Sequence, residues 1–108
     1  MKKRLNRLRK WLASKKRYKY DIVSELPSNL KPRVIYIEEN LGYPWQIAMI
    51  CPCGCGSNLH MNLINEYDPF WKYDIDKKDR ISLHPSIHRF VGCKSHFFIK
   101  KGIIIWCK

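Results

Sequence analysis

The sequence lacks a long hydrophobic run and the targeting signals that depend on one. Its N-terminus, MKKRLNRLRKWLASKKRYKY, has the basic start of a secretory leader but lacks the apolar run of about 7–15 residues that follows in such leaders. No segment reaches the roughly 20 apolar residues that a membrane-spanning helix needs. We therefore expect a cytoplasmic protein with no membrane span.

Acidic residues are absent from positions 1–20, which hold ten Lys or Arg. The rest of the chain holds eleven basic and nine acidic residues, so it is close to neutral. Leu5, Leu8 and Leu12 recur at helical spacing within the basic stretch. This pattern predicts a basic amphipathic helical arm over residues 1–20 and a separate domain over residues 21–108. The arm is suited to an acidic protein surface, anionic lipid or nucleic acid, or it is a frayed tail that orders only in a complex.

Short runs of β-type sequence, separated by turn residues, follow residue 26. Apolar and polar residues alternate in RVIYIEE (33–39) and NLHMNLI (58–64), and PWQIAMI (44–50) is a third strand candidate. The run HFFIKKGIIIW (96–106) is typical of a hairpin with a short turn at Lys100–Gly102. We therefore predict an all-β fold, a small antiparallel sheet domain that follows the helical arm.

Three of the five cysteines lie in one short segment, CPCGCG (51–56). Cysteines one residue apart point the same way along a strand, which disfavours a disulfide between them. Because zinc sites are usually built from two short clusters, the segment predicts a structural zinc that staples the domain. The expected ligands are Cys53, Cys55, Cys93 and Cys107. Cys51 is left out because it can belong to the preceding strand, and His96 is a rival ligand through its Cys-x-x-His spacing from Cys93.

These motifs resemble a family of small bacterial domains. The resemblance rests on LKPRVIYIEEN, CPCGCGSNLHMNL, SLHPSIH and GCKSHFFIKKGIIIWC, and it spans roughly residues 26–107. Members of that family are encoded in operons with ubiquitin-like proteins and their activating and conjugating enzymes. The resemblance implies a zinc-bearing peptidase of serine type that processes or removes a ubiquitin-like protein, with that protein and its conjugation enzymes as partners. The basic arm lies outside the resemblance.

The residues themselves also favour serine chemistry over zinc chemistry. A His-Glu-x-x-His motif is absent, and a zinc held by four thiolates has no free position for water. Serine catalysis needs a hydroxyl and a histidine within hydrogen-bonding distance. Ser95 and His96 are neighbours and would face opposite sides of a strand, so the pair must join two segments. We predict Ser86 as the nucleophile and His96 as the base.

Several alternatives to this pair remain open. Ser95 with His84 or His88 is the second choice of nucleophile and base. No carboxylate is evident as a third member, although Asp79 is close in sequence. Backbone N–H groups near Gly92 and Cys93 are the candidates for an oxyanion hole.

Two other functions fit a small zinc-stapled β-domain. One is a non-catalytic module that binds a ubiquitin-like protein through its sheet. The other is nucleic-acid binding, in which Lys and Arg neutralise phosphates and aromatic side chains stack on bases. The location of the charge disfavours nucleic acid, because nearly all of it lies in residues 1–20 and not on the body of the chain.

Overall fold

Alternating apolar residues build two four-stranded sheets, one from each half of the chain. The computed structural model describes residues 17–107, and these residues contain strands but no helix. The strands are β1 (Lys19–Val23), β2 (Val34–Asn40), β3 (Tyr43–Ile50), β4 (Asn58–Asn62), β5 (Lys72–Ile75), β6 (Ile81–His88), β7 (His96–Lys100) and β8 (Ile103–Trp106).

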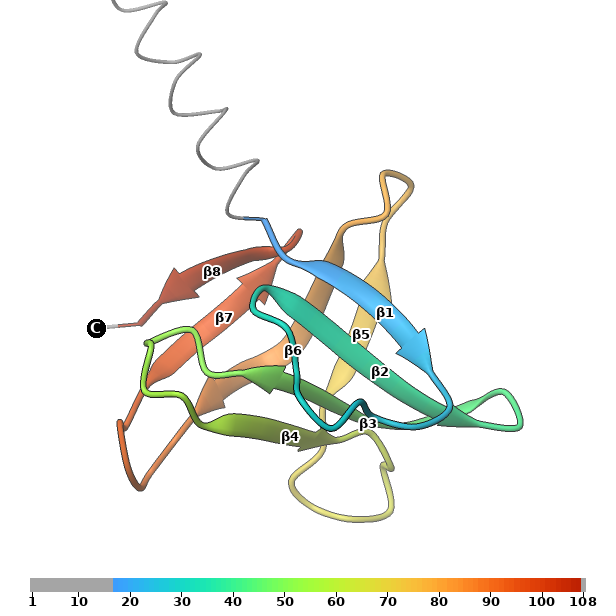
Figure 1. The fold of residues 1–108 in the computed structure, drawn as a ribbon, viewed down its shortest axis with the longest axis horizontal. Coiled ribbons are helices and arrows are strands. Elements are labelled where there is room, and N and C mark those ends of the chain that lie inside the picture. The colour runs from blue at the N-terminus through green and yellow to red at the C-terminus, as the bar shows by residue number, and fades with distance from the viewer. Residues whose placement is uncertain (1–16, 108) are drawn as a thin grey trace, which may run out of the picture.

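Each sheet keeps its strands in the order of the sequence. The first sheet has the order β1-β2-β3-β4 and the second the order β5-β6-β7-β8. All neighbouring strands are antiparallel except β1 and β2, which are parallel. Figure 1 shows the first sheet lying across the second, so the fold is a two-layer sandwich.

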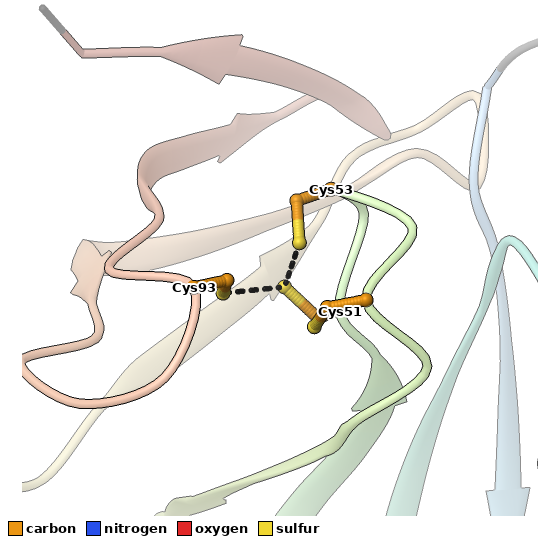
Figure 2. A group of neighbouring side chains, drawn as sticks. Cys51, Cys53 and Cys93 are labelled. Atoms are coloured by element: carbon orange, nitrogen blue, oxygen red, sulfur yellow. Dashed lines mark hydrogen bonds between the residues drawn. The ribbon is translucent and has the colours of Figure 1, made fainter.

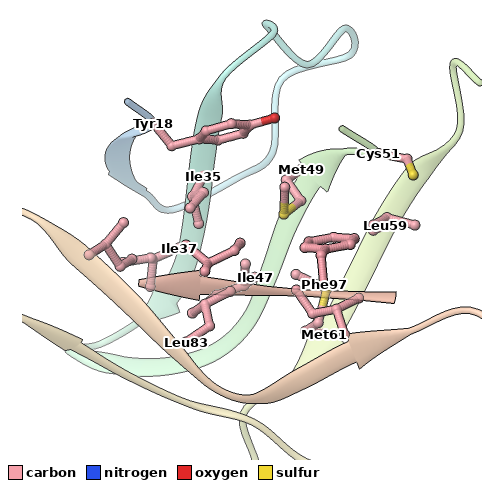
Figure 3. Close-up of a cluster of buried hydrophobic side chains, with 13 residues drawn as sticks. Tyr18, Ile35, Ile37, Ile47, Met49, Cys51, Leu59, Met61, Leu83 and Phe97 are labelled. Carbon is pink, nitrogen blue, oxygen red and sulfur yellow. The ribbon is translucent and has the colours of Figure 1, made fainter. Parts of the chain in front are cut away.

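The core lies between the two sheets and explains the alternation in the sequence. Figure 3 shows inward-facing side chains of both sheets meeting in one apolar cluster. In β2, Ile35 and Ile37 have no exposed surface, and Phe97 of β7 is equally buried. Fully burying an apolar side chain of this size stabilises the fold by about 1.5–3 kcal/mol. The main members of the cluster are Tyr18, Ile35, Ile37, Ile47, Met49, Cys51, Leu59, Met61, Ile81, Leu83, Ile87, Phe97 and Ile99.

Two parts of the predicted architecture are wrong. The helical arm cannot extend to residue 20, because Lys19–Val23 forms β1 and pairs with β2. Residues 1–16 of the predicted arm lie outside the described part of the chain. The single antiparallel sheet is in fact two sheets, one of which contains a parallel pair. Whether an arm and a zinc-binding domain, predicted at residues 1–20 and 21–108, are separate units stays a prediction, and β1 crosses the predicted boundary.

The segment before β1 is held against the hairpin turn between β7 and β8. The Tyr18 N–H donates to the carbonyl oxygen of Gly102 at 2.7 Å, and the Gly102 N–H donates to the carbonyl oxygen of Ile81 at 2.7 Å. Lys101 and Gly102 both have positive φ, at 52° and 77°, so the turn has two residues where three were predicted. The turn therefore connects the segment before β1 to the second sheet.

Gly102→Ala is expected to destabilise the domain by about 2–3 kcal/mol, because two penalties add. The residue has positive φ, and a Cβ atom there would lie 2.6 Å from Arg17 Cγ and 2.9 Å from the Tyr18 carbonyl oxygen. Gly42→Ala is the matched control, since Gly42 also has positive φ (82°) but a Cβ atom added there would meet nothing within 4 Å. We expect only about 1 kcal/mol there. Equal losses in chemical denaturation would contradict the close packing of residues 17 and 18 on the turn.

Candidate active site and cysteine cluster

The segment CPCGCG forms the tight turn between β3 and β4. Strand β3 ends at Ile50, so Cys51 is the first residue of this turn. The Cys51 N–H donates to the Ser57 carbonyl oxygen at 2.8 Å, which closes the turn. Gly54 and Gly56 have φ values of 90° and 82°, which favour glycine and let the chain fold back on itself. The chain changes direction at both glycines, and the three cysteine side chains of the turn therefore lie close together.

The fourth cysteine of the cluster, Cys93, comes from the loop between β6 and β7 in the other sheet. Figure 1 shows the β3–β4 turn and the β6–β7 loop side by side. The Sγ atoms of Cys51, Cys53, Cys55 and Cys93 all lie within 4.8 Å of one another. Figure 2 shows three of these side chains converging. The cluster therefore joins the two sheets at one end of the sandwich.

The sulfur spacing fits a tetrahedral metal site. Cys51 Sγ lies 3.4 Å from Cys53 Sγ and 3.7 Å from Cys93 Sγ. Ligands about 2.3 Å from a tetrahedral zinc are about 3.8 Å apart, so the observed separations are close to that geometry. Four thiol donors are a set that soft and borderline metals prefer. The four cysteines could therefore hold a metal ion.

Hydrogen bonds and burial give the thiols of the cluster different acidities. Hydrogen bonds from the Ser95 hydroxyl and backbone lower the pKa of Cys93 to about 5. Burial raises the pKa of Cys51 to about 11. Arg89 Nη1 lies 3.2 Å from Cys93 Sγ and 3.6 Å from Cys55 Sγ, where its charge offsets that of thiolates. The cluster thus contains at least one thiol predisposed to ionise, and a cation beside it.

The cluster differs from the predicted ligand set at one position. Cys53, Cys55 and Cys93 lie in it, Cys51 is the fourth member, and Cys107 lies outside the group. Cys107 follows β8, where its backbone N–H donates to the carbonyl oxygen of His96 at 2.9 Å. His96, the rival ligand, is not in the group either. Which residues bind a metal stays a prediction.

Ser86 and His96 lie on adjacent strands of the second sheet and meet across them. Ser86 Oγ is 2.9 Å from His96 Nε2, a hydrogen-bonding distance. Ser86 belongs to β6 and His96 is the first residue of β7. Both side chains are half-buried and lie on the outer side of the sheet, since their neighbours Ile87 and Phe97 point into the core. The structure therefore brings together the two residues that the sequence analysis paired.

A bulge in β6 sets the position of Ser86. The register shifts between Leu83, which pairs with Ile99, and Ile87, which pairs with Phe97, so β6 has two more residues here than β7. Pro85 has no N–H and cannot donate a hydrogen bond to the ladder, which suits it to a bulge. The Trp71 indole Nε1–H donates to the Ser86 carbonyl oxygen at 3.3 Å. The bulge therefore determines where Ser86 lies, and the hydrogen bond from Trp71 fixes the Ser86 backbone.

Ser95 faces the cysteine cluster and lies away from the histidines. Its Oγ atom is 3.1 Å from Cys93 Sγ and 3.8 Å from Cys51 Sγ, and the residue is 8% exposed. His96, the next residue, contacts Ser86 on the other side of the strand. The alternation along an extended chain thus separates the two neighbours. The structure pairs Ser95 with neither His84 nor His88 through a hydrogen bond.

No carboxylate among residues 17–107 forms an ion pair with His96. Asp79, the nearest candidate in the sequence, accepts a hydrogen bond from the Tyr20 hydroxyl at 2.9 Å. Asp74 lies 3.5 Å from Nε2 of His84, a different histidine. Ser86 and His96 therefore form a pair without a visible acidic third member, which we call the Ser86–His96 pair.

Sequence reasoning missed Trp71 and Arg89. The contact of Trp71 with Ser86 depends on the pairing of β5 with β6, and nothing near residue 71 in the sequence indicates it. Arg89 had a weak signal, because it lies four residues before Cys93 and in the same loop.

The described part of the chain contains no helix with the length and hydrophobicity needed to cross a membrane.

Comparison with known families gives one result that bears on this site. The family described as "Bacterial ubiquitination-like system serine protease (BubE)" matches residues 22–107. The matched range contains Ser86, His96 and all five cysteines. Searches of curated proteins and of solved structures find no significant match.

Proposed function

Because the chain belongs to the bacterial ubiquitination-like system serine protease family, we propose that it hydrolyses the bond after the C-terminal residue of a ubiquitin-like protein. That bond is a peptide or an isopeptide bond. The observation that carries the proposal is the 2.9 Å contact between Ser86 Oγ and His96 Nε2. It gives the family's reaction a nucleophile and a base within hydrogen-bonding distance.

In the first half of the reaction, Ser86 Oγ attacks the carbonyl carbon that precedes the scissile bond. His96 Nε2 accepts the hydroxyl proton as the new C–O bond forms. His96 then donates this proton to the leaving amine, and the C–N bond breaks. The products are a free amine and an ester between Ser86 and the ubiquitin-like protein.

In the second half, water hydrolyses that ester. His96 accepts a proton from the water as its oxygen attacks the ester carbonyl, and returns it to Ser86 Oγ as the C–O bond breaks. The ubiquitin-like protein leaves with a free carboxylate. The Trp71 hydrogen bond to the Ser86 carbonyl oxygen would keep the serine backbone fixed through both halves. Backbone N–H groups near Gly92 and Cys93 stay the predicted oxyanion donors.

The metal that we propose for the cysteine cluster is zinc, held by Cys51, Cys53, Cys55 and Cys93. Four cysteine sulfurs within 4.8 Å of one another, two of whose separations are near the 3.8 Å expected around tetrahedral zinc, support this choice. When bound, zinc supplies a cross-link between the two sheets and neutralises thiolate charge. With all four positions taken by sulfur, it has no role in binding water. The chemistry is therefore assigned to the chain's own side chains.

The edge of β6 near Ser86 is a suitable place for an extended substrate tail. Strand β5 pairs with β6 only up to His84, and beyond it the Trp71 indole bonds the Ser86 carbonyl oxygen, so the tail would add to β6 past Ser86, where none of the described strands pairs on that side. An extended chain can add to such an edge through backbone hydrogen bonds, with little demand on side-chain pockets. We propose that the tail of the ubiquitin-like protein lies here. Contact of residues 1–20 with an acidic surface of a partner stays a prediction.

A serine-directed probe tests the proposed nucleophile. A fluorophosphonate is expected to label Ser86, since the probe needs a serine activated by a neighbouring base. Peptide mass spectrometry locates the adduct, and His96→Ala is expected to suppress it. An adduct on Cys93 would indicate cysteine chemistry in place of the proposed reaction. Complete absence of labelling in a folded protein that binds a ubiquitin-like protein would favour a non-catalytic module.

A further inference from the structure

The orientation of the His96 ring needs a support that the Ser86–His96 pair does not itself provide. A catalytic histidine in a triad is normally oriented by a carboxylate. Among residues 17–107, no carboxylate pairs with His96, and the hydrogen bond that the structure gives its ring is the one to Ser86. One hydrogen bond fixes Nε2 but leaves the ring free to rotate about it.

The ring of His88 covers one face of the His96 ring. The two centroids are 4.2 Å apart and the planes differ by 13°, so the rings are stacked. His88 is the last residue of β6 and pairs directly with His96 at the start of β7. The Arg89 N–H donates to the Ser95 carbonyl oxygen at 2.8 Å, which makes 88 and 96 a non-hydrogen-bonded pair. Side chains approach most closely at such positions.

The His88 ring is itself held from its other side. Phe90 packs against it with a centroid distance of 4.4 Å and an interplanar angle of 38°. Phe90 lies in the β6–β7 loop, one residue after Arg89, and Arg89 contacts Cys93 in the cysteine cluster. The order of rings on the outer face of the sheet is therefore Phe90, His88, His96 and, at the longer centroid distance of 6.4 Å from His96, Phe98. This order places His88 between the β6–β7 loop and the histidine of the Ser86–His96 pair.

We propose that His88 is a positioning residue that orients the His96 imidazole toward Ser86 by stacking on its face. This role rests on the proposed function of the Ser86–His96 pair. No hydrogen bond joins His88 to Ser86 in the described part of the chain, and in this proposal His88 does not contact the reacting bond. In a triad, a carboxylate orients the histidine through a hydrogen bond. Here the His88 ring would orient His96 through ring contact.

The test compares three substitutions at this position in the full-length protein. His88→Ala and His88→Gln remove the ring, and each is expected to lower kcat by roughly 10- to 100-fold with little change in KM, because misplacing a catalytic group by about 1 Å has effects of this size. His88→Phe keeps a flat ring and is expected to recover most of the lost kcat. His60→Ala, an exposed histidine on β4 of the other sheet, is the control and should leave kcat unchanged.

Each outcome decides the proposal. Equal activity of His88→Ala and the wild-type protein overturns the role of His88, as does a folded His88→Phe that is as slow as His88→Ala. If His88→Ala does not fold, the comparison of His88→Gln with His88→Phe gives the answer. A ring-current shift of the His96 proton resonances, kept in His88→Phe and lost in His88→Gln, provides a readout independent of activity. A wild-type protein that cleaves no ubiquitin-like fusion contradicts the proposed function, whereas an active wild type beside an equally active His88→Ala contradicts only the role of His88.

Discussion

Ser86→Ala is expected to reduce the turnover of a ubiquitin-like fusion by roughly four to six orders of magnitude. Losses of this size follow when a serine nucleophile is removed, because only binding and oxyanion stabilisation then accelerate the reaction. His96→Ala should reduce turnover to a similar extent, since the hydroxyl 2.9 Å away loses its base. The double variant should be little worse than either single one, as expected for residues that act as a unit. Single-turnover cleavage of the fusion measures all three.

Ser82 and Ser95 provide the controls. Ser82 lies four residues earlier on β6, and its Oγ accepts the Lys101 N–H at 2.9 Å. Ser82→Ala should therefore leave turnover unchanged. Ser95→Ala removes a hydroxyl that contacts Cys93, so it should affect metal content and spare the chemical step. Normal cleavage by all the serine variants would exclude serine catalysis and leave the non-catalytic binding module as the explanation.

Removal of the metal is expected to abolish the cooperative unfolding transition of the domain. Structural zinc binds thiolate sites with an apparent free energy of about 10–16 kcal/mol, whereas a whole domain is stable by about 5–15 kcal/mol. The cluster is one of the links between the two sheets, and it spans Cys51 and Cys93. We therefore expect a chelator to flatten the thermal melt followed by circular dichroism. Elemental analysis should give about one zinc per chain before chelation.

Single cysteine variants distinguish the cluster from the ligand set predicted by the sequence. Cys51→Ser should lose zinc and stability together, because Cys51 lies within the cluster. Cys107→Ser should keep both, because Cys107 lies outside it. The reverse result would favour the set that includes Cys107. A metal-free protein that still melts cooperatively would show that the apolar core suffices by itself.

Local patterns in the sequence predicted strands at the positions of β2, β3, β4, β7 and β8, and they favoured a pair between Ser86 and His96, whose side chains lie within hydrogen-bonding distance. Alternation gave the buried face of β4, and it required Ser95 and His96 to face opposite sides of a strand. The structure has both features, and this geometry supports Ser86 over Ser95 as the partner of His96. The catalytic roles themselves are still predictions.

Features that depend on contacts between distant segments could not be predicted in the same way. Strand β1, Lys19–Val23, crosses the boundary between the basic stretch and the nearly neutral remainder of the chain, and its pairing with β2 makes it a strand. Cys51 belongs to the turn because β3 ends at Ile50. If β3 were one residue longer, Cys51 would belong to the strand. The position of Cys107 depends on the direction of its side chain after β8. These are properties of the packed sandwich.

The number of residues between two groups that meet in the site affects the order in which the parts of the site form. Ser86 and His96 are ten residues apart within one hairpin, whereas Cys51 and Cys93 are 42 residues apart in different sheets. Closing the longer loop costs about 1 kcal/mol more in chain entropy, and it also requires both sheets to be present. Hairpins form in about 1–10 μs, and non-local contacts form more slowly. The nucleophile and base can therefore meet early in folding, while the cysteines come together only when the sheets dock, so metal binding would secure a site that is already assembled.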